Sequence, residues 1–463
     1  MTSVPKTRLR IGVLGAARVL RKTWVAIHDA GHEITVVGCR DVSRAQKFVD
    51  ELSDSVSFVN KPIVGSYEDV VMSRNVDIVY IPIPAAIRHK WVLLCAEHGK
   101  HVVCEKPAAA SCKELEEWLQ RLAAKRLLFI DGTMLSHGKR VHDVRHAIGE
   151  IGKLRRMEAH FTFSASDDFI QNDIRLDPAL EPMGALGDLG WYCVRYFLHM
   201  VDFTLPSVAM GRVVQRSGPK NGISAFSGDL LFTVDGDPVW ASFFCSFHSA
   251  HEQLVRLHGD DGMITVHGAI NPTDVEVPTY TIERGTLAWS DGLPTFQREV
   301  TSRRSAEDCS FQMVQLWRDV AVALMRGESL AAMVVPEKSG PWARSAWATQ
   351  RVCEALLQSA QSSAARAAAA MATTTTTTTT TAVGMGSEKG NEDTTSVKVV
   401  ESGVRPTTTT TTTATATTAT ATTTTATPLV GTVVRPEAPV PVMPMPQIPA
   451  FVANKTMTAD VEV

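Results

Sequence analysis

The stretch Ile11-Gly12-Val13-Leu14-Gly15-Ala16-Ala17 decides the fold, because a short apolar run passes through a glycine into a segment with helical periodicity. Such a strand-to-helix turn presents backbone N–H groups and the positive end of the helix to a pyrophosphate. The glycine pattern is degenerate: with Gly15 as the first fingerprint glycine, Ala17 stands at the second position and Leu20 at the third. The alternative is a glycine that serves only a tight turn. The surrounding pattern of strands and helices favours the dinucleotide site.

That pattern extends to about residue 133. Short apolar runs predict strands at residues 11–14, 34–39, 76–81, 101–104 and 127–131. Amphipathic segments predict helices at residues 17–30, 43–52, 86–98 and 111–125. Strands that are apolar throughout and are joined by helices predict a parallel sheet covered on both faces. We therefore expect an α/β protein in which residues 1–133 form a doubly wound Rossmann domain that binds a dinucleotide.

The pattern changes twice after this domain. Residues 134–359 contain longer strands separated by turns, at 157–164, 207–215, 230–234, 238–247, 253–258 and 263–267, and helices at 310–326 and 341–358. This segment predicts a second domain built on an antiparallel sheet. Residues 360–463 are dominated by Ala, Thr and Pro, with an unbroken Thr run at 373–381. Such a segment buries too little apolar surface to offset its ordering entropy, so we expect a disordered tail.

Composition excludes several classes of protein. The chain has 46 Lys and Arg against 49 Asp and Glu, a formal net charge of −3, which argues against a nucleic-acid partner or an anionic membrane surface. No uninterrupted apolar run approaches the ~20 residues that span a bilayer, and the N-terminus lacks the apolar centre of a secretory signal. The eight cysteines contain no CxxC pair, so we expect reduced thiols in a cytoplasmic protein. The dispersed histidines predict no metal site.

The end of the second predicted strand, Cys39-Arg40-Asp41, is where the adenosine ribose of a dinucleotide would lie. An acidic residue directly at this strand end would favour a free 2′-hydroxyl. Arg40 instead offers a planar cation for a 2′-phosphate, which favours NADP over NAD. The alternative is a surface arginine that pairs with Asp41.

Three further side chains form a possible proton-transfer set. Lys106 follows the strand at residues 101–104, and Asp188 and Tyr192 stand four apart in a predicted helix over residues 186–200, where they share one face. A carboxylate, a phenol and a lysine beside a nicotinamide could serve alcohol–carbonyl interconversion. Each also has an ordinary structural alternative: Lys106 at a surface strand end, Asp188 as a helix cap, and Tyr192 as a core aromatic.

Taken together, Gly12-Val13-Leu14-Gly15-Ala16-Ala17, Cys39-Arg40, Glu105-Lys106-Pro107 and Gly187-Asp188-Leu189-Gly190-Trp191-Tyr192 resemble the glucose–fructose oxidoreductase, inositol dehydrogenase and rhizopine-catabolism (Gfo/Idh/MocA) family. The resemblance covers roughly residues 8–358 and no part of the Thr-rich tail. The stretch Asn172-Asp173-Ile174-Arg175, which leads to Gly184-Ala185-Leu186-Gly187-Asp188, is closer still to a branch of plant, fungal and protist oxidoreductases, and dimeric dihydrodiol and D-xylose dehydrogenases are similar relatives. The resemblance implies a C-terminal α/β domain with an open, mostly antiparallel sheet, whose face often forms a dimer interface in the family, so a homodimer is expected.

The resemblance also implies a set of site residues. The cofactor-binding positions would be Gly12, Gly15, Ala16, Ala17, Arg18, Arg40, Ile83, Pro84, His89, Glu105 and Lys106. Tyr192 matches the general acid/base, Asp188 the orienting carboxylate, and the Lys106–Pro107 bond is often cis in relatives. The positions that match possible substrate contacts are His137, Arg140 and Arg175.

The expected function is therefore an NADP-dependent oxidoreductase that acts on a sugar, a polyol or a related small molecule. Tyr192 would donate or accept the proton, and Lys106 would favour the phenolate because tyrosine otherwise has a pKa of ~10. The alternative is a regulatory or sensor protein of the same fold that binds NADP without turnover. Such a sensor need not keep Lys106, Asp188 and Tyr192, and all three are present.

Overall fold

A computed structural model describes residues 8–53, 60–272, 279–290, 293–305, 309–327 and 341–383. The chain divides into two compact units, residues 1–386 and 387–463, and all described residues belong to the first unit. None of the helices in these ranges is both long enough and apolar enough to cross a membrane.

The first sheet has six parallel strands in the order β3-β2-β1-β4-β5-β6. The strands are β1 (Arg10–Leu14), β2 (Glu33–Gly38), β3 (Ile63–Gly65), β4 (Ile78–Ile81), β5 (His101–Cys104) and β6 (Phe129–Asp131). The helices of this part are α1 (Arg18–Asp29), α2 (Val42–Ser53), α3 (Tyr67–Met72), η1 (Ala85–Ile87), α4 (His89–Glu97) and α5 (Cys112–Ala124). The strand order reverses between β1 and β4, and ligands of such sheets bind at the carboxyl ends of the strands beside this reversal.

This arrangement confirms the predicted Rossmann fold. It contains two short elements that were not predicted, and one predicted helix is divided. The short strand β3 and helix α3 were not predicted, although Ser66 and Asp69 form a complete capping box at the start of α3. Ser111 caps α5 by accepting a hydrogen bond from the Glu114 backbone N–H. The predicted helix at 86–98 is divided into η1 and α4.

The second sheet has eight strands in the order β14-β13-β12-β11-β7-β10-β9-β8. The strands are β7 (Leu154–Ser164), β8 (Val208–Ser217), β9 (Gly222–Val234), β10 (Asp237–Ser246), β11 (His248–Gly259), β12 (Gly262–His267), β13 (Thr279–Ser290) and β14 (Leu293–Arg304). Only β7 and β10 pair in parallel among these neighbours. The mostly antiparallel sheet is confirmed, and the hairpin of β13 and β14 was not predicted.

Helical segments join β6 to β7 and β7 to β8. Between β6 and β7 lie η2 (Met134–His137), α6 (Lys139–Ala147) and η3 (Ile148–Glu150), and between β7 and β8 lie α7 (Asp167–Asn172), η4 (Ile174–Leu176), a π-helical turn (Leu186–Gly190) and α8 (Trp191–Met200). Helix α9 (Cys309–Met325) was predicted as part of the second domain. It packs instead on the Rossmann core, because Leu316, Trp317 and Val320 are buried in the same cluster as β1 and α1. The division at residue 133 therefore separates the two sheets but not all the helices.

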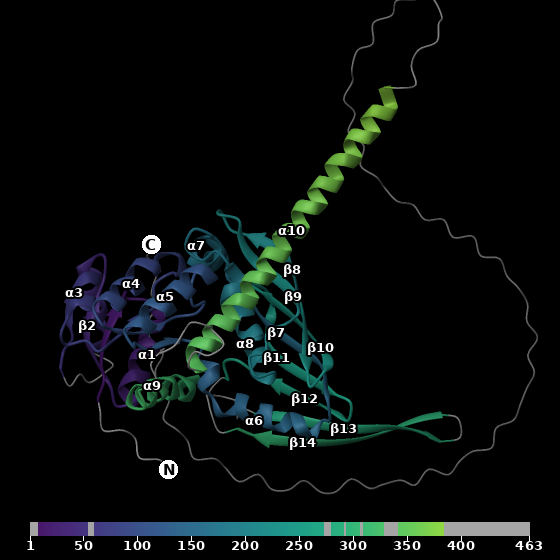
Figure 1. The fold of residues 1–463 in the computed structure, drawn as a ribbon, viewed down its shortest axis with the longest axis horizontal. Coiled ribbons are helices and arrows are strands. Elements are labelled where there is room, and N and C mark those ends of the chain that lie inside the picture. Colours follow the sequence, from purple (N-terminus) through teal and green to yellow (C-terminus); the bar gives the residue numbers. More distant parts are fainter. Residues whose placement is uncertain are drawn as a thin grey trace, which may run out of the picture. The chain divides into compact units, whose positions relative to one another are not determined.

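Helix α10 (Pro341–Val383) corrects the predicted start of the tail. In Figure 1 this helix runs along the second sheet, where the Gly211 backbone N–H of β8 donates to Ser359 Oγ at 3.3 Å. Ala360 is 6% exposed and belongs to the core, so the change of composition there does not end the fold. Alanine has the highest helix propensity, which allows the helix to continue. Residues 384–463, the rest of the predicted disordered segment, lie outside the described residues.

Candidate active site

The first turn of the Rossmann sheet depends on a glycine and leads into a helix start without a side-chain cap. Gly15 has φ +101°, and a Cβ there would lie 2.9 Å from Ile83 Cγ2, so this position requires glycine. Ala17 begins α1 without a side-chain cap, and the first turn of that helix carries no acidic residue. The N–H groups there, followed by Arg18, suit an anionic group. Gly12, by contrast, allows close packing, because a Cβ would lie 2.5 Å from Val70 Cγ1 of α3.

The end of β2 presents Arg40 as an exposed side chain. Asp41 accepts hydrogen bonds from Ser43 N at 2.9 Å and Ser43 Oγ at 2.7 Å. Its carboxylate is thus used at the start of α2, and no bond between Asp41 and Arg40 occurs among the described contacts. Burial raises the pKa of the Tyr67 phenol beside this strand end, and Arg40 opposes that shift through its charge and a side-chain hydrogen bond. Arg40 is therefore an exposed cation held beside Tyr67, which fits a contact with a 2′-phosphate.

The predicted contacts after β4 divide into two groups. Ile83 is buried against Gly15, and Pro84 leads into η1. The His89 ring lies between α4 and α5, where Nδ1 accepts from Trp118 Nε1 at 2.8 Å. His89 therefore faces a neighbouring helix and is not brought to the residues around Lys106.

Sequence reasoning missed Arg88, the residue beside it. Its side chain is buried, and it donates from Nε to the Ile83 carbonyl at 2.7 Å and from one terminal nitrogen to the carbonyls of Glu105 and Pro107. It thereby ties the end of β4 to the loop that carries Lys106. A charged residue directly before an apolar helix was the available signal.

Glu105 faces inward from the end of β5. Its Oε1 accepts from the Tyr80 hydroxyl at 2.6 Å. Burial raises the pKa of Tyr80 well above its usual value, and the Glu105 carboxylate acts in the same direction. Tyr80 therefore stays protonated as a donor, which orients Glu105 beside Lys106.

Lys106, Asp188 and Arg175 form the charged centre of the site. Lys106 Nζ lies 2.5 Å from Asp188 Oδ1 and 2.9 Å from the Asp188 carbonyl oxygen. Arg175 Nε lies 2.9 Å from the same Oδ1. Burial acts to raise the pKa of Asp188, but the two cations outweigh it and hold the pKa well below its usual value. Asp188 is consequently an anion at neutral pH, and it fixes Lys106 in place. The bond between Lys106 and Pro107 is cis, as expected from the resemblance.

Tyr192 completes the predicted set. Lys106 Nζ lies 5.0 Å from the centre of the Tyr192 ring, and the ring is buried with Phe161 of β7 against its edge. The continuous α-helix predicted over residues 186–200 is wrong in its first turn, because residues 186–190 form a π-helical turn before α8. Asp188 and Tyr192 nevertheless both contact Lys106. Inserted π-turns are frequent at functional sites.

The three predicted substrate contacts lie in different places. Arg175 is the one that pairs with Asp188. Arg140 is buried and donates to the carbonyls of His267 and Gly268 at the end of β12. His137 Nδ1 lies 2.7 Å from Asp319 Oδ2, and its ring stacks on Trp342. The structure thus brings Arg175 to the centre, whereas Arg140 and His137 are engaged in hydrogen bonds elsewhere in the fold.

Glu181 is a second residue that sequence reasoning missed. Its Oε1 accepts a hydrogen bond from the Ala85 backbone N–H at 3.0 Å, and this bond links the parts of the fold that contain the two sheets. Burial raises the pKa of its carboxyl, and Arg88 and Lys106 oppose that shift. Its position in an irregular segment provided no sequence signal. Among the described residues, no three His, Cys, Asp or Glu side chains come together as metal ligands.

Two family matches cover this architecture. Residues 9–132 match the family described as "Oxidoreductase family, NAD-binding Rossmann fold", and residues 143–265 match the "GFO/IDH/MocA C-terminal domain".

Individual relatives are enzymes of sugar and diol chemistry. D-xylose 1-dehydrogenase (NADP(+)) 2 of Haloferax volcanii is 26% identical over 69% of this chain and 94% of its own length. A dTDP-3,4-didehydro-2,6-dideoxy-alpha-D-glucose 3-reductase of Streptomyces antibioticus is 30% identical over 61% of this chain and 82% of its own. The 3-ketoreductase KijD10 of Actinomadura kijaniata, solved with NADP and TDP-benzene, has a TM-score of 0.61 at 23% identity, and the match covers 76% of this chain and 98% of that one. The similarity to KijD10 shows the fold alone.

Proposed function

Because the chain belongs to the Gfo/Idh/MocA family of oxidoreductases, we propose that it is an NADP-dependent enzyme that interconverts a hydroxyl and a carbonyl group on a sugar, a polyol or a related small molecule. The observation that carries this proposal is the meeting of Lys106, Asp188 and Tyr192 at the carboxyl end of β5. Ligands of parallel sheets bind at this edge.

The cofactor would be held by the residues that fit it. Gly15, Ala16 and Ala17 offer an uncapped helix start, Arg18 an adjacent cation, and Arg40 a cation for the 2′-phosphate. The names of the Haloferax relative and of the solved ketoreductase complex support NADP over NAD. When bound, the nicotinamide supplies or accepts the hydride.

The chain's own residues would manage the proton. Tyr192 donates a proton to the oxygen of a carbonyl substrate, or accepts one from a hydroxyl in the reverse direction. The Lys106 ammonium stabilises both the phenolate and a developing alkoxide because it places a positive charge beside them. Asp188, ionised at neutral pH, holds Lys106 and Arg175 in position.

Turnover of a substrate panel tests the proposal. The probes are D-xylose with NADP, a dTDP-linked keto sugar with NADPH, and trans-1,2-dihydrobenzene-1,2-diol with NADP, which represent the relatives' printed activities. Tyr192→Phe should lower kcat/KM by about 10²- to 10⁴-fold, the usual contribution of general acid–base catalysis, and should leave NADPH binding intact. Tyr196→Phe is the matched control, because Tyr196 is also a buried tyrosine of α8.

The alternative of a sensor predicts a different result. NADPH would bind with no turnover of any probe, and Tyr192→Phe would change nothing. Equal losses in the Tyr192 and Tyr196 variants would contradict the specific role of Tyr192.

The proposal extends to a homodimer formed through the second sheet, in a cytoplasmic protein. Trp240 of β10 is 40% exposed, pairs with Leu231 of β9 and stands on the same face as Phe244. Met210 of β8 is 46% exposed. Exposed apolar groups on one sheet face are typical of an interface.

A further inference from the structure

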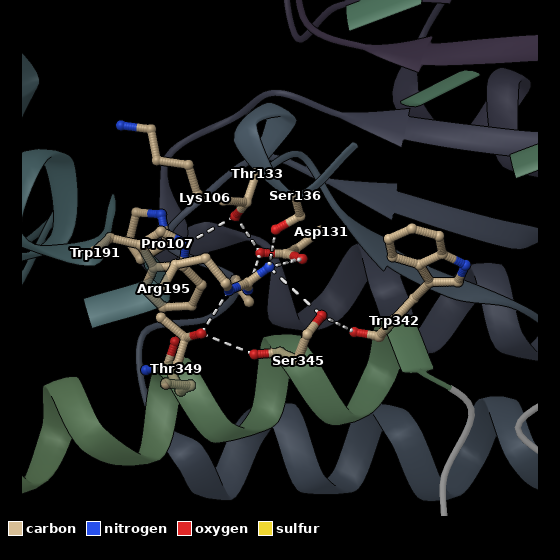
Figure 2. A network of polar contacts seen from close by, with 12 residues as sticks. Lys106, Pro107, Asp131, Thr133, Ser136, Trp191, Arg195, Trp342, Ser345 and Thr349 are labelled. Atoms are coloured by element: carbon tan, nitrogen blue, oxygen red, sulfur yellow. Dashed lines mark hydrogen bonds and ion pairs between the residues drawn. The ribbon is translucent and has the colours of Figure 1, made fainter. Parts of the chain in front are cut away.

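A buried polar cluster joins the Rossmann sheet to the helix that carries Tyr192. We call it the Arg195 network; its members are Asp131, Thr133, Ser136, Trp191, Arg195, Ser345 and Thr349 (Figure 2). Asp131 ends β6, Thr133 precedes η2, and Trp191 and Arg195 belong to α8. Ser345 and Thr349 come from α10. The network therefore connects three parts of the fold that lie far apart in the sequence.

The contacts of the network are well satisfied. Arg195 donates to both carboxylate oxygens of Asp131, at 2.7 and 3.3 Å, and from Nε to Thr349 Oγ1 at 2.6 Å. The Thr133 hydroxyl donates to Asp131 and accepts from Trp191 Nε1 at 2.8 Å. The side chains of Arg195 and Asp131 are 0% and 3% exposed. Each of these N–H and O–H donors thus has an acceptor, and the charged pair is buried away from solvent.

Stability alone does not account for such a pair. Removing two charges from water costs several kcal/mol per ion, and well-packed apolar residues of similar volume are often as stable or more stable. What a buried pair with fixed geometry provides is a single arrangement of the elements that it joins. The relevant question is which arrangement the Arg195 network determines.

The elements that it holds are those that position the site. Trp191 immediately precedes Tyr192 and also ends the π-helical turn that contains Asp188. The wider ring of a π-turn is rare and has to be supported by its surroundings. Gly187 of this turn is close to Pro107, because a Cβ there would lie 3.2 Å from Pro107 Cγ. In Figure 2 the side chain of Lys106 extends away from the network, and none of the hydrogen bonds given above for the network involves Lys106, Asp188 or Tyr192.

We propose that Thr133 and Trp191, backed by the Asp131–Arg195 pair, are positioning residues that fix the start of α8 so that Asp188 and Tyr192 meet Lys106. This inference rests on the proposed function. The hydrogen bond from Trp191 to Thr133 connects the carboxyl edge of the Rossmann sheet to the π-turn. Loss of that bond lets the turn relax toward ordinary helix geometry, which moves Asp188 relative to Lys106.

Thr133→Val removes this bond, together with the one from Thr133 to Asp131, with little change of shape. Trp191→Phe removes only the bond between the two side chains but leaves a smaller ring in a fully buried position. We expect each to lower kcat on the order of tenfold, because displacements of 1 Å at a reacting centre cost up to about 10²-fold, with the Kd for NADPH unchanged. A second readout needs no substrate: acetylation of Lys106 by an N-hydroxysuccinimide ester, followed by peptide mass spectrometry. Lys106 should react several-fold faster with the ester in both variants, because Asp188 no longer holds the Lys106 amine. The exposed Lys61 serves as the internal reference.

Two controls separate positioning from general stability. Thr133→Ser keeps the hydroxyl and should restore both the wild-type kcat and the wild-type labelling rate. Ser111→Ala removes the cap of α5, a typical loss of about 1 kcal/mol, and should change neither. Unchanged Lys106 labelling in both Thr133→Val and Trp191→Phe would overturn the inference. If the wild type turns over no probe, the proposed function fails while the labelling result still decides the positioning role.

Discussion

At the scale of single residues, the proposed contact of Arg40 with the 2′-phosphate of NADP can be tested directly. We expect Arg40→Ala to weaken NADP binding about ten- to hundredfold, because a hydrogen bond to a charged group contributes about 1.5–3 kcal/mol. NAD binding should be unchanged, since NAD has no 2′-phosphate. Fluorescence titration with both cofactors measures the two constants. Arg21→Ala is the charge control, because Arg21 pairs with Glu51 elsewhere on the surface; an equal loss of NAD and NADP affinity would remove the phosphate role.

Buried histidines make stability depend on pH. Burial lowers the pKa of His199 well below its usual value, and Arg195, His142, His137 and Arg145 act in the same direction. Burial also lowers the pKa of His32 and His101. The unfolded chain binds these protons near pH ~6.5, whereas the folded chain does not. The free energy of unfolding therefore has its full value above pH ~6.5. It falls as the pH drops below ~6.5, because unfolding is then accompanied by proton uptake.

Urea unfolding at a series of pH values between 5 and 8 measures this effect. Each such histidine contributes a slope of up to about 1.4 kcal/mol per pH unit below ~6.5. His199→Gln should show a shallower decline than the wild type because one titrating group is gone. A variant with the wild-type slope would mean that His199 is already protonated in the folded state.

Among the elements, α10 depends on its contact with β8. A Cβ at Gly211 would lie 2.0 Å from the Leu356 carbonyl oxygen and 2.8 Å from Phe226 Cζ. We expect Gly211→Ala to lower the free energy of unfolding by about 1–3 kcal/mol, the usual cost of overpacking. Gly149→Ala is the matched control, since nothing lies within 4 Å of a Cβ there. Thermal and urea unfolding compare the two, and equal stability would show that α10 can shift without cost.

At the scale of the whole molecule, polar contacts join the Rossmann part of the fold to the segment that follows β7. Arg18 of α1 lies 3.1 Å from Asp173, which also pairs with Arg175. The Ala86 backbone N–H donates to the Leu180 carbonyl at 3.1 Å, beside the bond from Ala85 to Glu181. The segment between η4 and the π-turn thus contacts the turn that follows β4 of the first sheet.

Assembly is the property of the whole molecule that can be tested directly. We expect Trp240→Glu to convert the proposed homodimer into monomers, because it replaces an exposed apolar side chain of this sheet face with a charge. Ile63→Glu is the control, since Ile63 is 59% exposed on β3, away from that face. Sedimentation equilibrium measures the mass; a monomeric wild type, or a dimeric Trp240 variant, would refute this interface.

The sequence by itself determined the class of fold, and it indicated the three residues of the proposed proton-transfer set. Local patterns of residue types predict the continuous apolar strands and the Gly15 turn. The same kind of pattern indicates Lys106, Asp188 and Tyr192, because each stands at a recognisable place in a predicted element. Only the tertiary structure decided that residues 186–190 form a π-turn, that Arg88 and Glu181 border the site, and that α10 continues past Ala360. These outcomes depend on contacts between segments up to a few hundred residues apart, such as Arg195 with Thr349. Burial and pairing between segments that are distant in the sequence determine which side chains meet. The pattern of residue types along the chain does not contain this information.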